Sequence, residues 1–428
     1  MEKRHGVDES GTGVLSSDSS AIVELERKGL PNGGLKAWLQ ILGAFFLYFN
    51  TWGIVSSFGS YQSYYEDAIL KGASSFQISS IGSIQSFLMV FFGFIAGPVF
   101  DRGHFSHLLK TGSILILVGT VMQGLSFEYW HLLLSQGVCM GIGMGCLAVP
   151  SVAVPSSWFT SKLPFANGIV VSASGFGGVV YPIMVRSLIP IVGFKYTSLS
   201  VALVIFITLG ISNVVLQQPT TPQAKRAFFD QSALTDTPYI LFVLGCMLSF
   251  LGLYTTFFYL ASYAVEAGIT TDSTALYFVS ILNGASVFGR ILPNIPSLTL
   301  RLGPLNMMVA SVVSMAIIVL CFNAGPSLAG LLVMIILYGF FTGAFFTLQP
   351  TIFARLTEDS GRIGTRTGMA STICSIGLLL GAPSAGGLWR TYGFPASWAW
   401  SGVSLASGAL VMAISRCIVS GWRLRASV

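Results

Sequence analysis

Long apolar runs alternate with short polar breaks over most of the chain, beginning near Ala37 after a polar stretch. A membrane-spanning helix needs about 20 apolar residues. The pattern predicts twelve spans, near 37–60, 77–100, 106–127, 130–154, 164–190, 196–216, 238–265, 273–295, 305–324, 327–353, 366–389 and 396–416. The longest break between spans lies at the middle of the chain. We therefore expect an all-α membrane protein with twelve transmembrane helices in two pseudo-symmetric six-helix bundles.

The same pattern predicts the domain organisation. It comprises a disordered cytosolic tail at 1–36, an N-terminal six-helix bundle at 37–216, a cytosolic linker at 217–237, a C-terminal six-helix bundle at 238–416 and a cytosolic tail at 417–428.

Composition excludes a soluble globular enzyme. Apolar residues make up 53% of the 428 residues and charged residues only 9%, whereas an average soluble domain carries about 25% charged residues. The six cysteines are scattered, and no Cys/His group has metal-ligand spacing. We therefore expect no metal, no cofactor and no catalytic residues.

The placement of basic residues tests the topology. With the N-terminus in the cytosol, eighteen of the 22 Lys and Arg residues lie on the cytosolic side, and Lys71, Arg186, Lys195 and Arg390 lie outside. The positive-inside rule predicts this bias. We expect a multi-pass protein of the plasma membrane with both termini cytosolic. The net charge of +6 then reflects topology and does not indicate nucleic-acid binding.

Glycine clusters within the predicted spans. The runs 162–178 and 362–387 each open with a basic residue followed by Gly168 or Gly368, 200 residues apart. This weak internal symmetry is typical of transporters built from two related halves. Small residues allow close helix packing where lipid supplies no hydrophobic drive, and generic helix packing is the alternative explanation.

The loop after the second predicted span carries the first resemblance to a known family. Residues 97–104 read GPVFDRGH, which resembles the G-x-x-x-D-R-x-G motif of the major facilitator superfamily. The resemblance implies that Asp101 and Arg102 belong to a cytosolic gate; a plain loop turn is the alternative. The final glycine comes one residue early, and His104 replaces a further basic residue.

A narrower resemblance covers more of the chain. Residues 32–65, with their W-G, S-F-G and Y-Y motifs, are similar to the opening of the monocarboxylate porter family, especially its fungal members. The FGRILPN run at 288–294 and GTRTG at 364–368 also resemble that family. The chain lacks the family's first-span Lys, and Ser286 stands where an Asp is expected. The resemblance therefore implies an anion anchor at Arg290 without the family's proton site.

Arg290 is the candidate charge within a span. An ionisable group in the bilayer is costly and usually functional. Its planar guanidinium suits a substrate carboxylate, or its long side chain extends to the cytosolic interface. Both readings remain open.

Uncharged polar groups supply the other candidate substrate contacts. They are Asn50, Asn283, Tyr254 and Gln349, and interhelical hydrogen bonding is the alternative role for each. No Asp or Glu lies deep in a predicted span and no His is central. Proton symport, uniport and anion exchange therefore all remain open, with protons as a conceivable coupling ion.

These observations favour a secondary active or facilitative transporter that moves a small organic acid or related carboxylated metabolite by alternating access. Its partners would be the lipid bilayer and a small-molecule substrate, an organic anion, and not a nucleic acid. One alternative is an exporter of a secondary metabolite from a biosynthetic pathway. Another is a non-transporting nutrient receptor on the same scaffold. A membrane-embedded enzyme is disfavoured because the spans lack clustered His or carboxylate groups.

Overall fold

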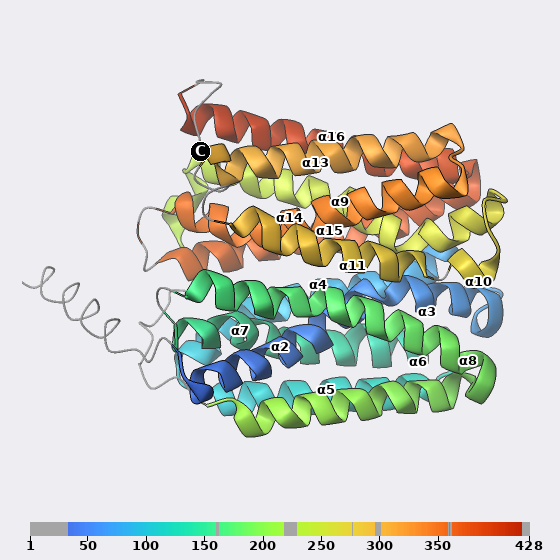
Figure 1. Ribbon diagram of the computed structural model, residues 1–428, viewed down its shortest axis with the longest axis horizontal. Coiled ribbons are helices and arrows are strands. Elements are labelled where there is room, and N and C mark those ends of the chain that lie inside the picture. Colours follow the sequence, from blue (N-terminus) through green and yellow to red (C-terminus); the bar gives the residue numbers. More distant parts are fainter. Residues whose placement is uncertain are drawn as a thin grey trace, which may run out of the picture.

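The computed structural model describes residues 33–159, 162–217, 229–275, 277–295, 301–357, 359 and 362–421. Most of the two predicted tails and of the predicted linker lie outside these ranges. Every regular element within them is a helix, which confirms the all-α prediction. The long helices run side by side along the longest axis of the molecule (Figure 1).

The first bundle extends from α2 to α8. Its elements are α2 (Leu35–Ser56), α3 (Phe58–Tyr64), η1 (Tyr65–Ile69), α4 (Ser75–Asp101), α5 (Phe105–Gly124), α6 (Tyr129–Leu132), η2 (Leu133–Met140), α7 (Gly141–Ser156) and α8 (Leu163–Val215). The second bundle is preceded by η3 (Gln231–Leu234). It contains α9 (Thr237–Glu266), α10 (Asp272–Ala275), α11 (Phe278–Ile291), η4 (Leu292–Asn294), α13 (Pro304–Cys321), η5 (Phe322–Ala324), α14 (Leu328–Arg355), α15 (Ile363–Tyr392) and α16 (Phe394–Val419).

These helices provide twelve membrane passes. Ten of the described helices are long and apolar enough to span a membrane. Helix α8 holds two passes, because Gly193 interrupts it with φ 77° and ψ 169°, a conformation that glycine adopts without a Cβ clash. The shorter apolar helix α11 supplies the remaining pass. The predicted number of spans is therefore confirmed.

Several long helices begin at side chains that satisfy free backbone N–H groups. Ser74 and Gln77 form a reciprocal capping box at the start of α4. The Asp236 carboxylate accepts from the Tyr239 N–H at the start of α9, and Ser327 caps α14 in the same way. Short polar breaks in the sequence thus become helix starts at the ends of the bundles.

The two ends of the molecule are distinguished by the chain termini. We call the end where α2 begins and α16 ends the terminal end, and the opposite end the far end; the terminal end is on the left in Figure 1. Between the two bundles, α4 packs against α15 and α8 packs against α11. These pairs border the space in which a central cavity can form.

Glycines permit close helix contact at specific positions. A Cβ atom at Gly177 would lie 2.6 Å from the Phe49 carbonyl oxygen, so α8 and α2 approach closely there. A Cβ at Gly368 would meet the Phe94 ring of the other bundle at 2.7 Å. Gly168 has open space around its Cβ position. Only Gly368 of the sequence-matched pair therefore has the close contact that the glycine pattern suggested.

Candidate functional site

A cavity of about 440 Å³ lies between the two bundles. The first bundle contributes Tyr48 and Trp52 of α2 and residues of α4 and α7, and the second contributes Phe346 and Gln349 of α14. The lining continues to Gly97 near the end of α4 and, at the start of α15, to residues 363–365, 367 and 368. Because those segments lie at the terminal end, the cavity extends from the middle of the molecule toward that end.

Arg290 lies beside the inner part of this cavity. Its residue is only 3% exposed, and its guanidinium carbon is 5.6 Å from the centroid of the Phe346 ring, which lines the cavity. The Nη1 atom is 3.3 Å from the position a Cβ would take at Gly175 of α8, in the other bundle. The guanidinium is therefore buried between the bundles. The alternative, in which the long side chain extends to the membrane interface, would require it to reach the terminal-end surface, and it does not.

Two tyrosines lie near the same charge. Tyr48 comes from the first bundle and Tyr254 from the second, and both are within electrostatic range of Arg290. The Tyr254 ring packs edge-on against Phe346 with centroids 6.5 Å apart. Its hydroxyl is buried and makes no hydrogen bond within the described part of the chain. A buried hydroxyl normally finds a partner, so this one has an unused hydrogen-bonding capacity on a residue that packs against Phe346, part of the cavity wall.

Asn50 has the contacts expected of the alternative role, interhelical hydrogen bonding. Its Nδ2 donates to the Phe46 carbonyl at 2.6 Å and to Thr208 Oγ1 at 2.9 Å. Its Oδ1 accepts from the Tyr181 hydroxyl at 2.5 Å. These contacts join α2 to α8 inside the first bundle. Asn50 therefore has the geometry of an interhelical hydrogen-bonding residue.

Asn283 and Gln349, both of the second bundle, have different surroundings. Asn283 Nδ2 donates to the Gly178 carbonyl at 3.2 Å, which connects α11 to α8 across the interface. Its Oδ1 is buried without a hydrogen bond among the described residues. Gln349 lines the cavity, and its amide lies 4.0 Å from the Cys374 sulfur. Of these candidates, Gln349 lines the cavity, Arg290 and Tyr254 pack against the lining residue Phe346, and Asn283 lies at the bundle interface.

Asp101 and Arg102 lie at the mouth of the cavity. Asp101 is the buried last residue of α4, and Arg102 follows as the exposed C-cap. Gly97 and Pro98, one turn earlier, belong to the cavity lining. Gly103 then turns the chain with φ 86°. The motif is therefore positioned where a gate at the terminal end would act.

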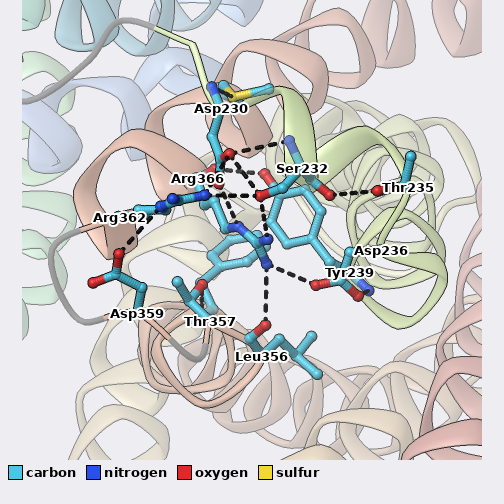
Figure 2. Close-up of polar contacts among 12 residues, drawn as sticks. Asp230, Ser232, Thr235, Asp236, Tyr239, Leu356, Thr357, Asp359, Arg362 and Arg366 are labelled. Carbon is cyan, nitrogen blue, oxygen red and sulfur yellow. Dashed lines mark hydrogen bonds and ion pairs between the residues drawn. The ribbon is translucent and has the colours of Figure 1, made fainter. Parts of the chain in front are cut away.

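A second charged cluster borders the same mouth, and the sequence did not single it out. Arg366 lies in the first turn of α15. Its Nε donates to Asp230 Oδ2 at 2.9 Å and its Nη1 to Asp236 Oδ2 at 2.7 Å. A further bond goes to the Leu356 carbonyl at 3.3 Å. Figure 2 shows Arg366 at the centre of these contacts.

The cluster extends to the element that precedes α9. Ser232 Oγ donates to Asp230 Oδ1 at 2.6 Å and accepts from Arg362 and Arg366 at 3.2 Å (Figure 2). The Ser232 hydrogen bond and the Arg366 guanidinium lower the pKa of the Asp230 carboxyl to about 2. The carboxylate therefore remains ionised at any physiological pH. The cluster joins η3, α9 and α15 into one rim of the mouth.

The far end is closed. The rings of Phe58 in α3 and Phe258 in α9 are 4.8 Å apart, and a Cβ at Gly59 would collide with the Phe257 backbone. Arg390 Nε of α15 donates to Ser75 Oγ of α4 at 2.7 Å, across the bundle interface. The central cavity thus extends toward the terminal end, and close contacts join the two bundles between it and the far-end surface.

Comparisons with known proteins agree with this architecture. The model of the Major Facilitator Superfamily matches residues 41–300. The chain is 40% identical over 384 residues to "MFS-type transporter dbaD" of Emericella nidulans, which covers 89% of this chain and 86% of that protein.

Two further relatives have names that refer to efflux. The "Aspyridones efflux protein apdF" of Emericella nidulans is 31% identical, with 91% of this chain and 81% of the relative covered. The "Agnestins efflux protein AgnL12" of Paecilomyces divaricatus is 32% identical, with 89% and 87% covered. With twelve passes in two bundles and a cavity between them, the chain belongs to the major facilitator superfamily of membrane transporters.

Proposed function

We propose that this protein exports a carboxylated secondary metabolite by alternating access, with Arg290 as the contact for the carboxylate. The observation that carries the proposal is the buried guanidinium of Arg290 beside a cavity shared by both bundles. A planar guanidinium can bind both oxygens of a carboxylate, and such charge-assisted bonds are stronger where water is excluded.

The chemistry of the cavity favours a partly aromatic anion. Trp52, Phe346 and Phe353 give it large apolar walls, and Gln349, Ser371 and Tyr48 contribute polar groups. Its volume of about 440 Å³ is within the range of small-molecule sites. The resemblance to fungal monocarboxylate porters and the efflux names of two relatives support the same substrate class and direction.

The proposed orientation places both termini in the cytosol and the far end outside the cell, in the plasma membrane. In this orientation the structure is open toward the cytosol and closed toward the exterior. An exporter loads its substrate in that state. Rocking of the bundles would then close the mouth near Asp101 and Arg102 and open the far end.

The substrate is identified by comparing metabolites inside and outside producing cells with and without this protein. An exporter is expected to raise the external share of one or a few organic acids. If the internal and external pools are unchanged, the export proposal is wrong and a receptor on the same scaffold becomes the better explanation.

The role of Arg290 is tested with that metabolite in membrane vesicles. Arg290→Ala is expected to lower transport at least about tenfold, the effect of losing about 1.4 kcal/mol from a charge-assisted contact. Arg301→Ala serves as the matched control, because Arg301 is an exposed arginine whereas Arg290 is buried between the bundles. Equal transport by both variants, at equal amounts in the membrane, would contradict the assignment.

A further inference from the structure

The far end contains a second, smaller pocket between the bundles, with a volume of about 270 Å³. Five charged side chains line it. Glu66, Asp67 and Arg186 come from the first bundle, and Glu266 and Arg390 come from the second. The pocket lies where the two bundles must separate if the far end is to open, so its charges change their surroundings during that movement.

Glu66 differs from the other two carboxylates in its burial. Asp67 and Glu266 are exposed, whereas Glu66 is half-buried. Its Oε1 accepts from Gln62 Nε2 at 3.2 Å. Within the described part of the chain, Glu66 forms no ion pair within 4.0 Å; Arg390 directs its Nε to Ser75 instead.

A half-buried carboxylate with a neutral amide partner is more easily protonated than one in water. Burial disfavours the charged form, and it raises the pKa of the Glu66 carboxyl. The hydrogen bonds from Gln62 and Ser75 and the charge of Arg390 offset only part of this effect, and the neighbouring Asp67 adds to it. Opening the far end would hydrate Glu66 and return its pKa toward the ordinary value.

This difference in the Glu66 pKa between the closed and open states determines which state protonation favours. A group whose pKa is higher in the closed state binds its proton more tightly there, so protonation favours that state. The other titratable groups near the pocket are Asp67 on η1, Arg186 on α8, Tyr259 and Glu266 on α9, and Arg390 on α15. The other two carboxylates are already exposed in the closed state, so opening the far end changes their hydration little.

We propose that Glu66 is a proton-binding site of the outer gate, and that a proton bound from the exterior favours closure of the two bundles at the far end. The inference rests on the proposed function for its place in the cycle. In export, this closure is the step that follows release of the substrate. The ligand of this site is a proton, delivered from the exterior while the pocket is hydrated.

The test follows the conformation directly and needs no transported substrate. Spin labels are placed at Lys71→Cys and Tyr392→Cys, two exposed far-end positions on opposite bundles. The background carries Ser or Ala in place of the six native cysteines. Distances between the labels are measured by pulsed electron resonance in lipid nanodiscs at pH 5 and pH 8. We expect the ratio of long to short distances to rise several-fold at pH 8.

Two variants assign the response to Glu66. Glu66→Gln, which mimics the protonated form, is expected to give the short distance at both pH values. Asp67→Asn, its neighbour on the same element, is expected to respond as the parent does. If Glu66→Gln does not fold, Gln62→Leu replaces it; loss of the amide donor should move the pH midpoint upward.

A parent protein that shows no pH dependence between pH 5 and pH 8 would overturn the proposal. An unchanged response in Glu66→Gln, or an unmoved midpoint in Gln62→Leu, would do the same. The readout is separate from export. A protein that responds to pH through Glu66 but moves no metabolite would refute the proposed function and leave the proton site standing.

Discussion

At the scale of single residues, two buried tyrosines near the interface have hydroxyls in opposite situations. The Tyr181 hydroxyl donates to Asn50 Oδ1 inside the first bundle. The Tyr254 hydroxyl is buried and has no hydrogen bond among the described residues. The first hydroxyl supports the framework, whereas the second can serve a ligand.

This contrast predicts different outcomes for the same substitution. Tyr181→Phe is expected to lower the free energy of unfolding by about 1–3 kcal/mol, because it leaves the buried Asn50 oxygen unsatisfied. Tyr254→Phe should leave stability nearly unchanged and reduce transport. Thermal unfolding and vesicle transport of both variants provide the measurement. A large loss of stability in Tyr254→Phe would show that its hydroxyl has a structural role instead.

Arg290 could be predicted from the sequence because an arginine within an apolar run is conspicuous, but its surroundings could not. Its neighbours Gly175, Tyr48 and Phe346 come from three different helices. Asn50 shows the converse. An amide in a span looks like a binding residue, and only the position of Tyr181, 131 residues away, shows that it is already hydrogen-bonded.

At the scale of elements, the span positions followed closely from hydropathy, because each helix must satisfy its own backbone hydrogen bonds in lipid. The short elements between the spans could not be predicted from hydropathy. The sequence indicated a cytosolic break before α9, but the short helix η3 is held by contacts from Asp230 to Arg366, 136 residues later. A hydropathy pattern contains no information about such a pairing.

The pairing of η3 with α15 predicts a specific pH dependence. Asp230 is 8% exposed, and its folded-state pKa of about 2 is below its usual value of about 4. Its contribution to stability is therefore complete above about pH 4 and is lost as the pH falls through about 2. Because the Arg362 side chain that also contacts Asp230 is exposed to solvent, we expect Asp230→Asn to cost only about 1 kcal/mol at pH 7.

The measurement is the difference in melting temperature between Asp230→Asn and the parent as a function of pH. The difference should be constant from pH 5 to pH 8 and should shrink below about pH 4. Asp359→Asn is the matched control, since Asp359 contacts Arg362 with an exposed side chain and should change stability by less. A difference that grows as the pH falls would contradict the assigned pKa direction.

At the scale of the whole molecule, the sorting of basic residues predicted which loops share a side, but it contains no information about which end is open. That depends on contacts between bundles, such as Phe58 with Phe258 at the far end. The two states of a carrier share one sequence and differ by a few kcal/mol. The closed far end is therefore a property that only the three-dimensional packing reveals.

The open mouth and the proposed orientation together predict sided access to the cavity. Ser371 lines the cavity on α15, and Ser371→Cys changes its size little. In a background without native cysteines, a membrane-impermeant maleimide should modify this thiol faster from the cytosolic side than from the exterior. Tyr392→Cys at the exposed far end should show the reverse preference. A bias of about 1.4 kcal/mol toward the cytosol-open state gives about a tenfold difference in rate.

If both thiols react faster from the same side, either the orientation or the open state assigned to the molecule is wrong. The two are separated by labelling Ser371→Cys in detergent, where both faces are accessible and only burial can slow the reaction.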